Sequence, residues 1–289
     1  MYQNVFKGEG MIRTNLKYFL KYGRFIFGGK ETGQVFVVGT GRSGTNFMAR
    51  VLNAHVEISD LSGGRENSFV FGDVARRAVQ DKKLGQFTLK KYRLLSRAAS
   101  PRIFLDQSHP NLWHIEELIN AFPKSKFIGR VRCPYSVAYS TMKHDNVKRW
   151  FFDYAGLTSE SRFLGLTKDI AENYDRYSIA QKSALRWCAH MYRLDKVTRM
   201  HKKSFLVVNY EQLCRRPEPI LKAIENFLEL DHEFSIPDVN LASLDKKRQL
   251  LDKDIDFITR MVDEYFSVNR LEDENFVPLK RYLEFGKGV

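Results

Sequence analysis

The segment GTGRSGTN at residues 39–46 combines three glycines with hydroxyl side chains and one arginine. Gly39 and Gly44 have the G-x-x-x-x-G spacing of phosphate-binding loops, although Thr45 stands where nucleotide hydrolases have lysine. A glycine-rich turn that leads into a helix offers several backbone N–H groups at the positive end of the helix dipole, and both attract an anion. Arg42 adds a guanidinium that can form paired hydrogen bonds to a phosphate or sulfate. These residues predict an anion-binding loop whose cation is Arg42.

Short apolar runs must position this loop. Four uninterrupted runs of β-branched and aromatic residues predict buried parallel strands at 34–38, 102–106, 126–131 and 204–210. Apolar residues recur at steps of three and four after Pro110 and again after Pro217, which predicts helices. Alternating strands and helices indicate a three-layer α/β domain with a mostly parallel central sheet and helices on both faces. Ligands of such sheets bind at the carboxyl ends of the strands, where the glycine-rich loop begins.

The chain has 289 residues, a hydrophobic content of 43% and a formal charge of +13. We expect a basic helical extension at 1–30 and a single α/β domain at 31–289. Charged, glycine-containing stretches at 60–100 and 145–180 interrupt the alternation, and we expect them to form the walls of an acceptor site. Ordinary covering helices are the alternative for both stretches. The positive charge favours anionic ligands without choosing among nucleic acid, lipid, phosphorylated cofactors and acidic glycans.

Signals for export or membrane insertion are weak. No apolar run is long enough to span a bilayer, and the N-terminal LKYFLKYGRFIFGG is interrupted by Lys21 and Arg24. We expect a short element packed on the domain there, with peripheral membrane contact as the alternative. The three cysteines are widely spaced, which predicts free thiols in a reducing compartment. A cytoplasmic location is therefore expected, although a fragment of a membrane-anchored protein would give the same signals.

Two segments together resemble a known enzyme family. The loop GTGRSGTN is similar to the 5′-phosphosulfate loop of sulfotransferases that use 3′-phosphoadenosine 5′-phosphosulfate (PAPS), although Asn46 replaces the usual second threonine. The later KFIGRVRCPYSVAYS is similar to the family's pattern of an apolar strand, an arginine, a proline and a serine eight positions after the arginine. Arg132 would leave the strand end and Ser140 would lie on the next helix, so both would face the 3′-phosphate that distinguishes PAPS from ATP. Two signatures in this order are far more specific than either alone.

The resemblance implies a P-loop-like nucleotide-binding fold and the transfer of a sulfuryl group from PAPS to a hydroxyl or amine. The product would be 3′,5′-adenosine diphosphate (PAP), and no metal would be required. The basic and aromatic character of the expected walls favours a saccharide or glycan acceptor, with no nucleic-acid partner. Arg42 would stabilise the leaving group. The cofactor-binding residues implied are Gly41, Arg42, Ser43, Gly44, Thr45, Asn46, Arg132, Ser140 and Tyr210.

Two side chains are candidates for the base that removes the acceptor proton. In LSGGRENSFVF, Glu66 resembles the catalytic glutamate of the Lys-Glu-x-x-x-Phe element in glycan sulfotransferases, with Arg65 at the lysine position. In LDQSHPNLW, His109 resembles the catalytic histidine of the Lys-Thr-His-x-Pro element in small-molecule sulfotransferases, although Gln107 replaces the lysine. The two assignments imply different acceptor classes, and we favour Glu66. A surface salt bridge for Glu66 and a buried structural histidine for His109 are the alternatives.

Two other functions compete with this interpretation. In an ATP-dependent kinase or hydrolase, Asp106 at the end of IFLD would hold magnesium. Against it, Thr45 replaces the expected lysine, and an ATP site would not need the pair Arg132 and Ser140. A non-catalytic polyanion binder is the second alternative, suggested by the net charge and by a basic cluster. That cluster comprises Lys143, His144, Lys148 and Arg149.

Overall fold

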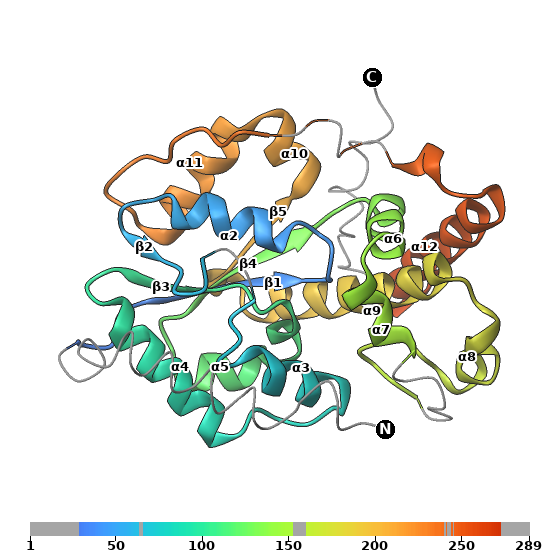
Figure 1. The fold of residues 1–289 in the computed structure, drawn as a ribbon, viewed down its shortest axis with the longest axis horizontal. Helices are drawn as coiled ribbons and strands as arrows, with labels where there is room; N and C mark the ends of the chain where they lie inside the picture. Colours follow the sequence, from blue (N-terminus) through green and yellow to red (C-terminus); the bar gives the residue numbers. More distant parts are fainter. Residues whose placement is uncertain are drawn as a thin grey trace.

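The computed structural model describes residues 29–63, 66–152, 160–239, 241, 244 and 246–272. Five strands form one sheet of parallel neighbours in the order β2-β3-β1-β4-β5 (Figure 1). The strands are β1 (Gln34–Gly39), β2 (Ile58–Ser59), β3 (Ile103–Asp106), β4 (Lys126–Val131) and β5 (Phe205–Asn209). The four predicted strands are confirmed with small shifts at their ends. The sequence does not predict β2, because two residues are too few to form an apolar run.

Helices cover both faces of this sheet (Figure 1). One face is covered by α2 (Thr45–Asn53), α10 (Tyr210–Arg215) and α11 (Pro217–Leu228). The other face is covered by α4 (Gln86–Ala99), α5 (Ile115–Ala121) and α9 (Ile179–Met200). The predicted three-layer α/β fold is therefore confirmed. The helix expected after Pro110 begins as the 3₁₀ helix η1 (His109–His114) before it continues as α5.

Side chains of the central strand alternate between the two helical layers. Val35 and Val37 pack with α2 and α11, whereas Phe36 and Val38 pack with α4, α5 and α9. The Phe36 ring stacks on Phe127 of β4 at 5.4 Å between centroids. Burying each such side chain contributes roughly 1.5–3 kcal/mol to folding. The end of β1, where the glycine-rich loop starts, is thereby held in a fixed place.

The order of the strands creates a crevice at the end of β1. From β1 the chain crosses to β2 and returns through β3 on one side, and it then places β4 and β5 on the other side. Because all pairs are parallel, the carboxyl ends of β3, β1 and β4 meet at one edge of the sheet. The segments that follow these strands contain His109, the glycine-rich loop and Arg132 respectively.

The remaining helices are packed around this framework. They are α3 (Phe71–Val79), α6 (Pro134–Met142), α7 (Asp145–Phe152), α8 (Lys168–Asn173) and α12 (Asp252–Glu272). Within the predicted stretch 60–100, α4 is a covering helix, because Tyr92 and Leu95 are buried against the sheet. The expected extension at 1–30 lies outside the described residues, apart from its last two positions. Among the helices described, none is both long enough and apolar enough to cross a membrane.

Candidate functional site

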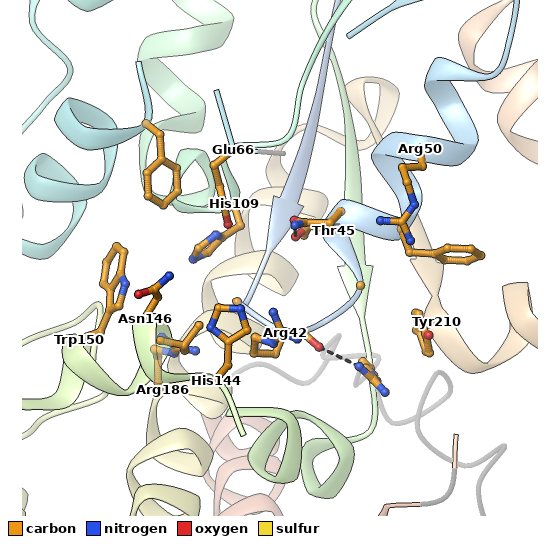
Figure 2. A pocket seen from close by; sticks show the side chains of 17 residues that line it. Arg42, Thr45, Arg50, Glu66, His109, His144, Asn146, Trp150, Arg186 and Tyr210 are labelled. Atoms are coloured by element: carbon orange, nitrogen blue, oxygen red, sulfur yellow. Dashed lines mark hydrogen bonds between the residues drawn. The ribbon is translucent and has the colours of Figure 1, made fainter. Parts of the chain in front are cut away.

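A cavity of about 500 Å³ lies beside the glycine-rich loop (Figure 2). Its lining includes these predicted site residues: Gly41, Arg42, Gly44, Thr45, Asn46, Glu66, His109, Arg132 and Tyr210. Ser43, within the loop, and Ser140, which contacts Arg42 of the loop, lie outside the described lining. Ser43 Oγ donates to the carbonyl oxygen of Thr40 at 2.7 Å and so braces the turn from within. The structure thus brings together residues that are far apart along the chain.

The backbone of the loop has a positive φ at three positions. Gly39 has a φ of 150°, Arg42 a φ of 72° and Gly44 a φ of 87°. Glycine adopts this left-handed region at little cost, whereas other residues rarely do and are concentrated at functional sites. Helix α2 starts at Thr45 without an acidic residue in its first turn, and no described side chain caps it. The first N–H groups of α2 are therefore open to an anionic ligand.

Arg42 joins the two predicted phosphate sites. Its Nε donates to Ser140 Oγ at 3.0 Å, and its carbonyl oxygen accepts from Nη1 of Arg132 at 3.1 Å. Arg132 directly follows β4 and Ser140 lies in α6, as the spacing predicts. Burial and the Arg132 charge lower the pKa of Arg42, and the Glu66 carboxylate partly offsets this. The Nε of Arg42 is thus engaged, and no described residue donates or accepts at its two terminal nitrogens, which can bind a ligand.

Tyr210 forms the wall on the other side of the loop. It starts α10, and its ring lies 4.3 Å from Cζ of Arg132 and 5.8 Å from the Phe47 ring centroid. The backbone of Gly44 passes so close that a Cβ there would lie 2.4 Å from the Tyr210 ring. The ring, the turn and Arg132 therefore form one tightly packed unit.

Both candidate bases line the cavity. Glu66 is exposed and lies near enough to Arg42 to influence its pKa. His109 is buried in η1, and its Nε2 lies 3.3 Å from the point where a Cβ on Gly41 would stand. Burial, followed by the charge of Arg186, holds the pKa of His109 well below its usual range. The imidazole is therefore neutral at physiological pH, and gaining a proton there is unfavourable.

Comparison with known proteins identifies the family of this chain. A sequence profile described as the sulfotransferase family matches residues 34–234, which include the strands, the loop and every predicted site residue. The chain belongs to the sulfotransferase family. No curated protein matches the sequence.

Solved sulfotransferase structures share the fold. The sulfotransferase domain of the Synechococcus PCC 7002 olefin synthase is 17% identical, with a TM-score of 0.51 over 81% of this chain and 96% of that one. Sulfotransferase STF9 from Mycobacterium avium is 12% identical, with a TM-score of 0.52 over 87% of this chain and 80% of that one. Mouse sulfotransferase SULT7A1, complexed with PAP, is 16% identical, with a TM-score of 0.44 over 88% of this chain and 90% of that one. At these identities the likeness to the Synechococcus domain and to STF9 is one of fold.

Some residues in the cavity of this sulfotransferase were not assigned to the site from the sequence. They include Arg50, Asn146 and Arg186. The sequence does contain a pattern that could have pointed to Arg186. Arg186 and His190 are one turn apart on α9, on the side that also buries Trp187. Polar residues in such a buried stripe require a partner or a ligand.

Phe71 and Trp150 come from the two stretches expected to form acceptor walls. Their ring centroids lie 6.3 Å apart, and the His109 ring lies 6.0 Å from Phe71 and 6.1 Å from Trp150. Trp150, Asn146 and Val147 line the cavity from one face of α7. Parts of both stretches thus reach the cavity, whereas α4 does not line it.

Asp106 does not fit the magnesium role of the kinase alternative. Its carboxylate is fully buried and accepts hydrogen bonds from the N–H and hydroxyl of Ser108, from Nδ2 of Asn111 and from the Tyr92 hydroxyl. Burial raises the pKa of Asp106 to about 7. The side chain is absent from the described lining of the cavity, so it serves the packing beneath η1.

Replacing Gly44 by alanine is expected to weaken PAP binding about tenfold or more and to destabilise the fold by about 1–3 kcal/mol. The new Cβ would clash with the Tyr210 ring and would impose a strained φ. Titration calorimetry with PAP and thermal melting measure the two effects. Gly33→Ala is the matched control, because a Cβ there meets only Ile103 at 3.9 Å. Equal PAP affinity in Gly44→Ala and wild type would contradict this prediction.

Proposed function

We propose that this sulfotransferase transfers the sulfuryl group of PAPS to a hydroxyl or amine acceptor, releasing PAP. The observation that best supports the proposal is the link from Arg132 to the Arg42 carbonyl and from Arg42 Nε to Ser140. It joins a loop suited to a 5′-phosphosulfate directly to a pair suited to a second phosphate. ATP has no 3′-phosphate for that pair to bind.

The charges around the cavity support an anionic donor. Its described lining contains four arginines and a single carboxylate, that of Glu66. The arginines are Arg42, Arg50, Arg132 and Arg186. In our proposal the N–H groups of the loop, with Thr45 and Asn46, hold the 5′-phosphosulfate, and Arg132 and Ser140 hold the 3′-phosphate. Charge that develops on the bridging oxygen is then stabilised by Arg42, because fixed donors in a partly buried site act strongly on such charge.

We propose Glu66 as the base that takes the acceptor proton. Its carboxylate lines the cavity and is close to Arg42, so it lies near the expected transfer site. His109 is less suited, because burial and neighbouring cations disfavour its protonated form. In this proposal His109 instead orients the acceptor through a neutral ring nitrogen.

The acceptor end of the cavity is lined by aromatic and polar groups. Phe71, Trp150, Asn146 and His109 lie there, and they offer flat faces with a few hydrogen-bonding groups. Such a combination suits a ring-shaped polar acceptor, and we propose a saccharide or glycan. Incubation with PAPS and a panel of saccharides, phenols and peptides, read by mass spectrometry, tests this. A sulfuryl group gained only by phenols would overturn the saccharide assignment.

Addition of PAP is expected to raise the melting temperature, whereas ATP with magnesium is expected to have little effect. At a concentration of 100 times Kd, a ligand of the folded state contributes about 2.7 kcal/mol, a shift on the order of 5 °C for a protein of this size. Differential scanning fluorimetry measures both ligands under the same conditions. Stabilisation by ATP with magnesium but not by PAP would favour the kinase alternative instead.

A further inference from the structure

Arg186 is a buried cation with no function in the proposal so far. It lies in the middle of α9, its side chain is 1% exposed, and it lines the cavity. Within the part of the chain that the structure describes, its Nε and Nη2 have no hydrogen-bond partner. Burying a charged group without hydrogen-bond partners costs free energy, and a bound anion that accepts those hydrogen bonds would offset this cost.

The surroundings of Arg186 do not neutralise its charge. Burial lowers its pKa to about 10, which still leaves it protonated at neutral pH, and nearby Arg42 adds to this lowering. The described residues provide no salt bridge to Arg186; the Phe151 ring lies 5.0 Å from its Cζ, and Tyr174 offsets only part of the lowering of its pKa. A ring face offers roughly 0.5–2 kcal/mol to a cation, less than the cost of its burial.

The position of Arg186 points to the transfer site. Its Nη2 lies 3.1 Å, and His109 Nε2 lies 3.3 Å, from the point where a Cβ on Gly41 would stand. Gly41 directly precedes Arg42 in the loop. Figure 2 shows Arg186 and Tyr210 on opposite sides of Arg42. Arg186 therefore lies at the end of the loop away from Tyr210.

Building on the proposed function, we infer that Arg186 binds the non-bridging oxygens of the sulfuryl group during its transfer. The bond between sulfur and the bridging oxygen breaks, and PAP leaves with the electron pair. A bond forms between sulfur and the acceptor oxygen, whose proton goes to the base. Arg186 and Arg42 hold the group from two sides, and neither gains nor loses a proton.

The test compares two ligands that differ only by the sulfuryl group. In Arg186→Met, which keeps the volume without the charge, PAP affinity is expected to stay within about threefold of wild type, because PAP lacks this group. PAPS affinity, measured without acceptor, is expected to fall about tenfold or more through the loss of charge-assisted hydrogen bonds. Arg186→Lys is expected to restore part of it. Isothermal titration gives both affinities for each variant.

Stability separates this role from a structural one. Removing an unpaired buried charge is expected to leave the melting temperature of the ligand-free Arg186→Met protein unchanged or raised. Arg193→Met is the control on the same helix, since Arg193 donates to Glu116 and to the Leu112 carbonyl and its loss should lower stability without changing PAPS affinity. Unchanged PAPS affinity in Arg186→Met, or a melting temperature well below wild type, would overturn the inference. Failure of wild-type protein to bind PAP would instead remove the proposed function.

Discussion

Replacement of Arg132 by alanine is expected to weaken PAP binding by about 100-fold. Hydrogen bonds from a guanidinium to a phosphate contribute about 1.5–3 kcal/mol, and a forked pair lost together accounts for this factor. The substitution also removes the hydrogen bond to the Arg42 carbonyl and the contact with the Tyr210 ring, so the loop loses part of its support. Isothermal titration with PAP measures the change.

The second ligand for this test is adenosine 5′-phosphosulfate, which has no 3′-phosphate. Wild type and Arg132→Ala should bind it within about fivefold of one another, a margin that allows for loosening of the loop. Ser140→Ala is expected to lose PAP affinity by about fivefold, because a neutral hydroxyl contributes less than a cation. Equal losses for both ligands in Arg132→Ala would show that Arg132 only supports the loop.

Glu66→Gln is expected to lower kcat by about 100- to 1000-fold with little change in PAP affinity. General-base catalysis contributes about this much, and glutamine keeps the shape of the side chain without a proton-accepting carboxylate. Turnover is measured as PAP released from PAPS with the acceptor that the mass-spectrometric screen identifies. In Glu66→Ala, added formate is expected to restore part of the rate, because a small carboxylate can enter the vacated space.

His109→Gln provides the comparison for this prediction. A neutral amide retains hydrogen bonding to the acceptor, so kcat is expected to fall by about tenfold or less. The low pKa of His109 means that the imidazole stays neutral across the neutral pH range, so its ionisation contributes no step to the pH–rate profile there. A loss of turnover in His109→Gln that exceeds the loss in Glu66→Gln would transfer the role of base to His109.

The strands of the sheet were predictable because each is encoded by a short run of neighbouring residues. The apolar runs correspond to β1, β3, β4 and β5, since strands buried on both faces of a sheet consist mostly of apolar residues. Such local signals do not predict the two-residue β2 or the 3₁₀ helix η1 that precedes α5. A two-residue strand is recognised only by its hydrogen bonds to a neighbouring strand. The choice between 3₁₀ and α geometry depends on tertiary packing, here over the buried Asp106 and its hydrogen-bond partners.

The site was predictable where a motif encodes its own geometry. The glycines of the loop determine the backbone of one turn. The spacing from Arg132 to Ser140 places two side chains across the end of one strand and the start of the next helix. Arg186 could not be assigned in this way. Its helix begins far from the loop in sequence, and only the packing of α9 against the sheet brings it beside Gly41.

The class of fold, the glycine-rich loop and the two segments that resemble the family follow from the sequence, because each depends on residues close together in the chain. Only the packing of distant elements brings Arg42 into contact with Ser140, 98 positions away along the chain. It also decided the surroundings of His109 and Arg186, since burial and charge at a site come from every element packed there. A single motif does not contain that information.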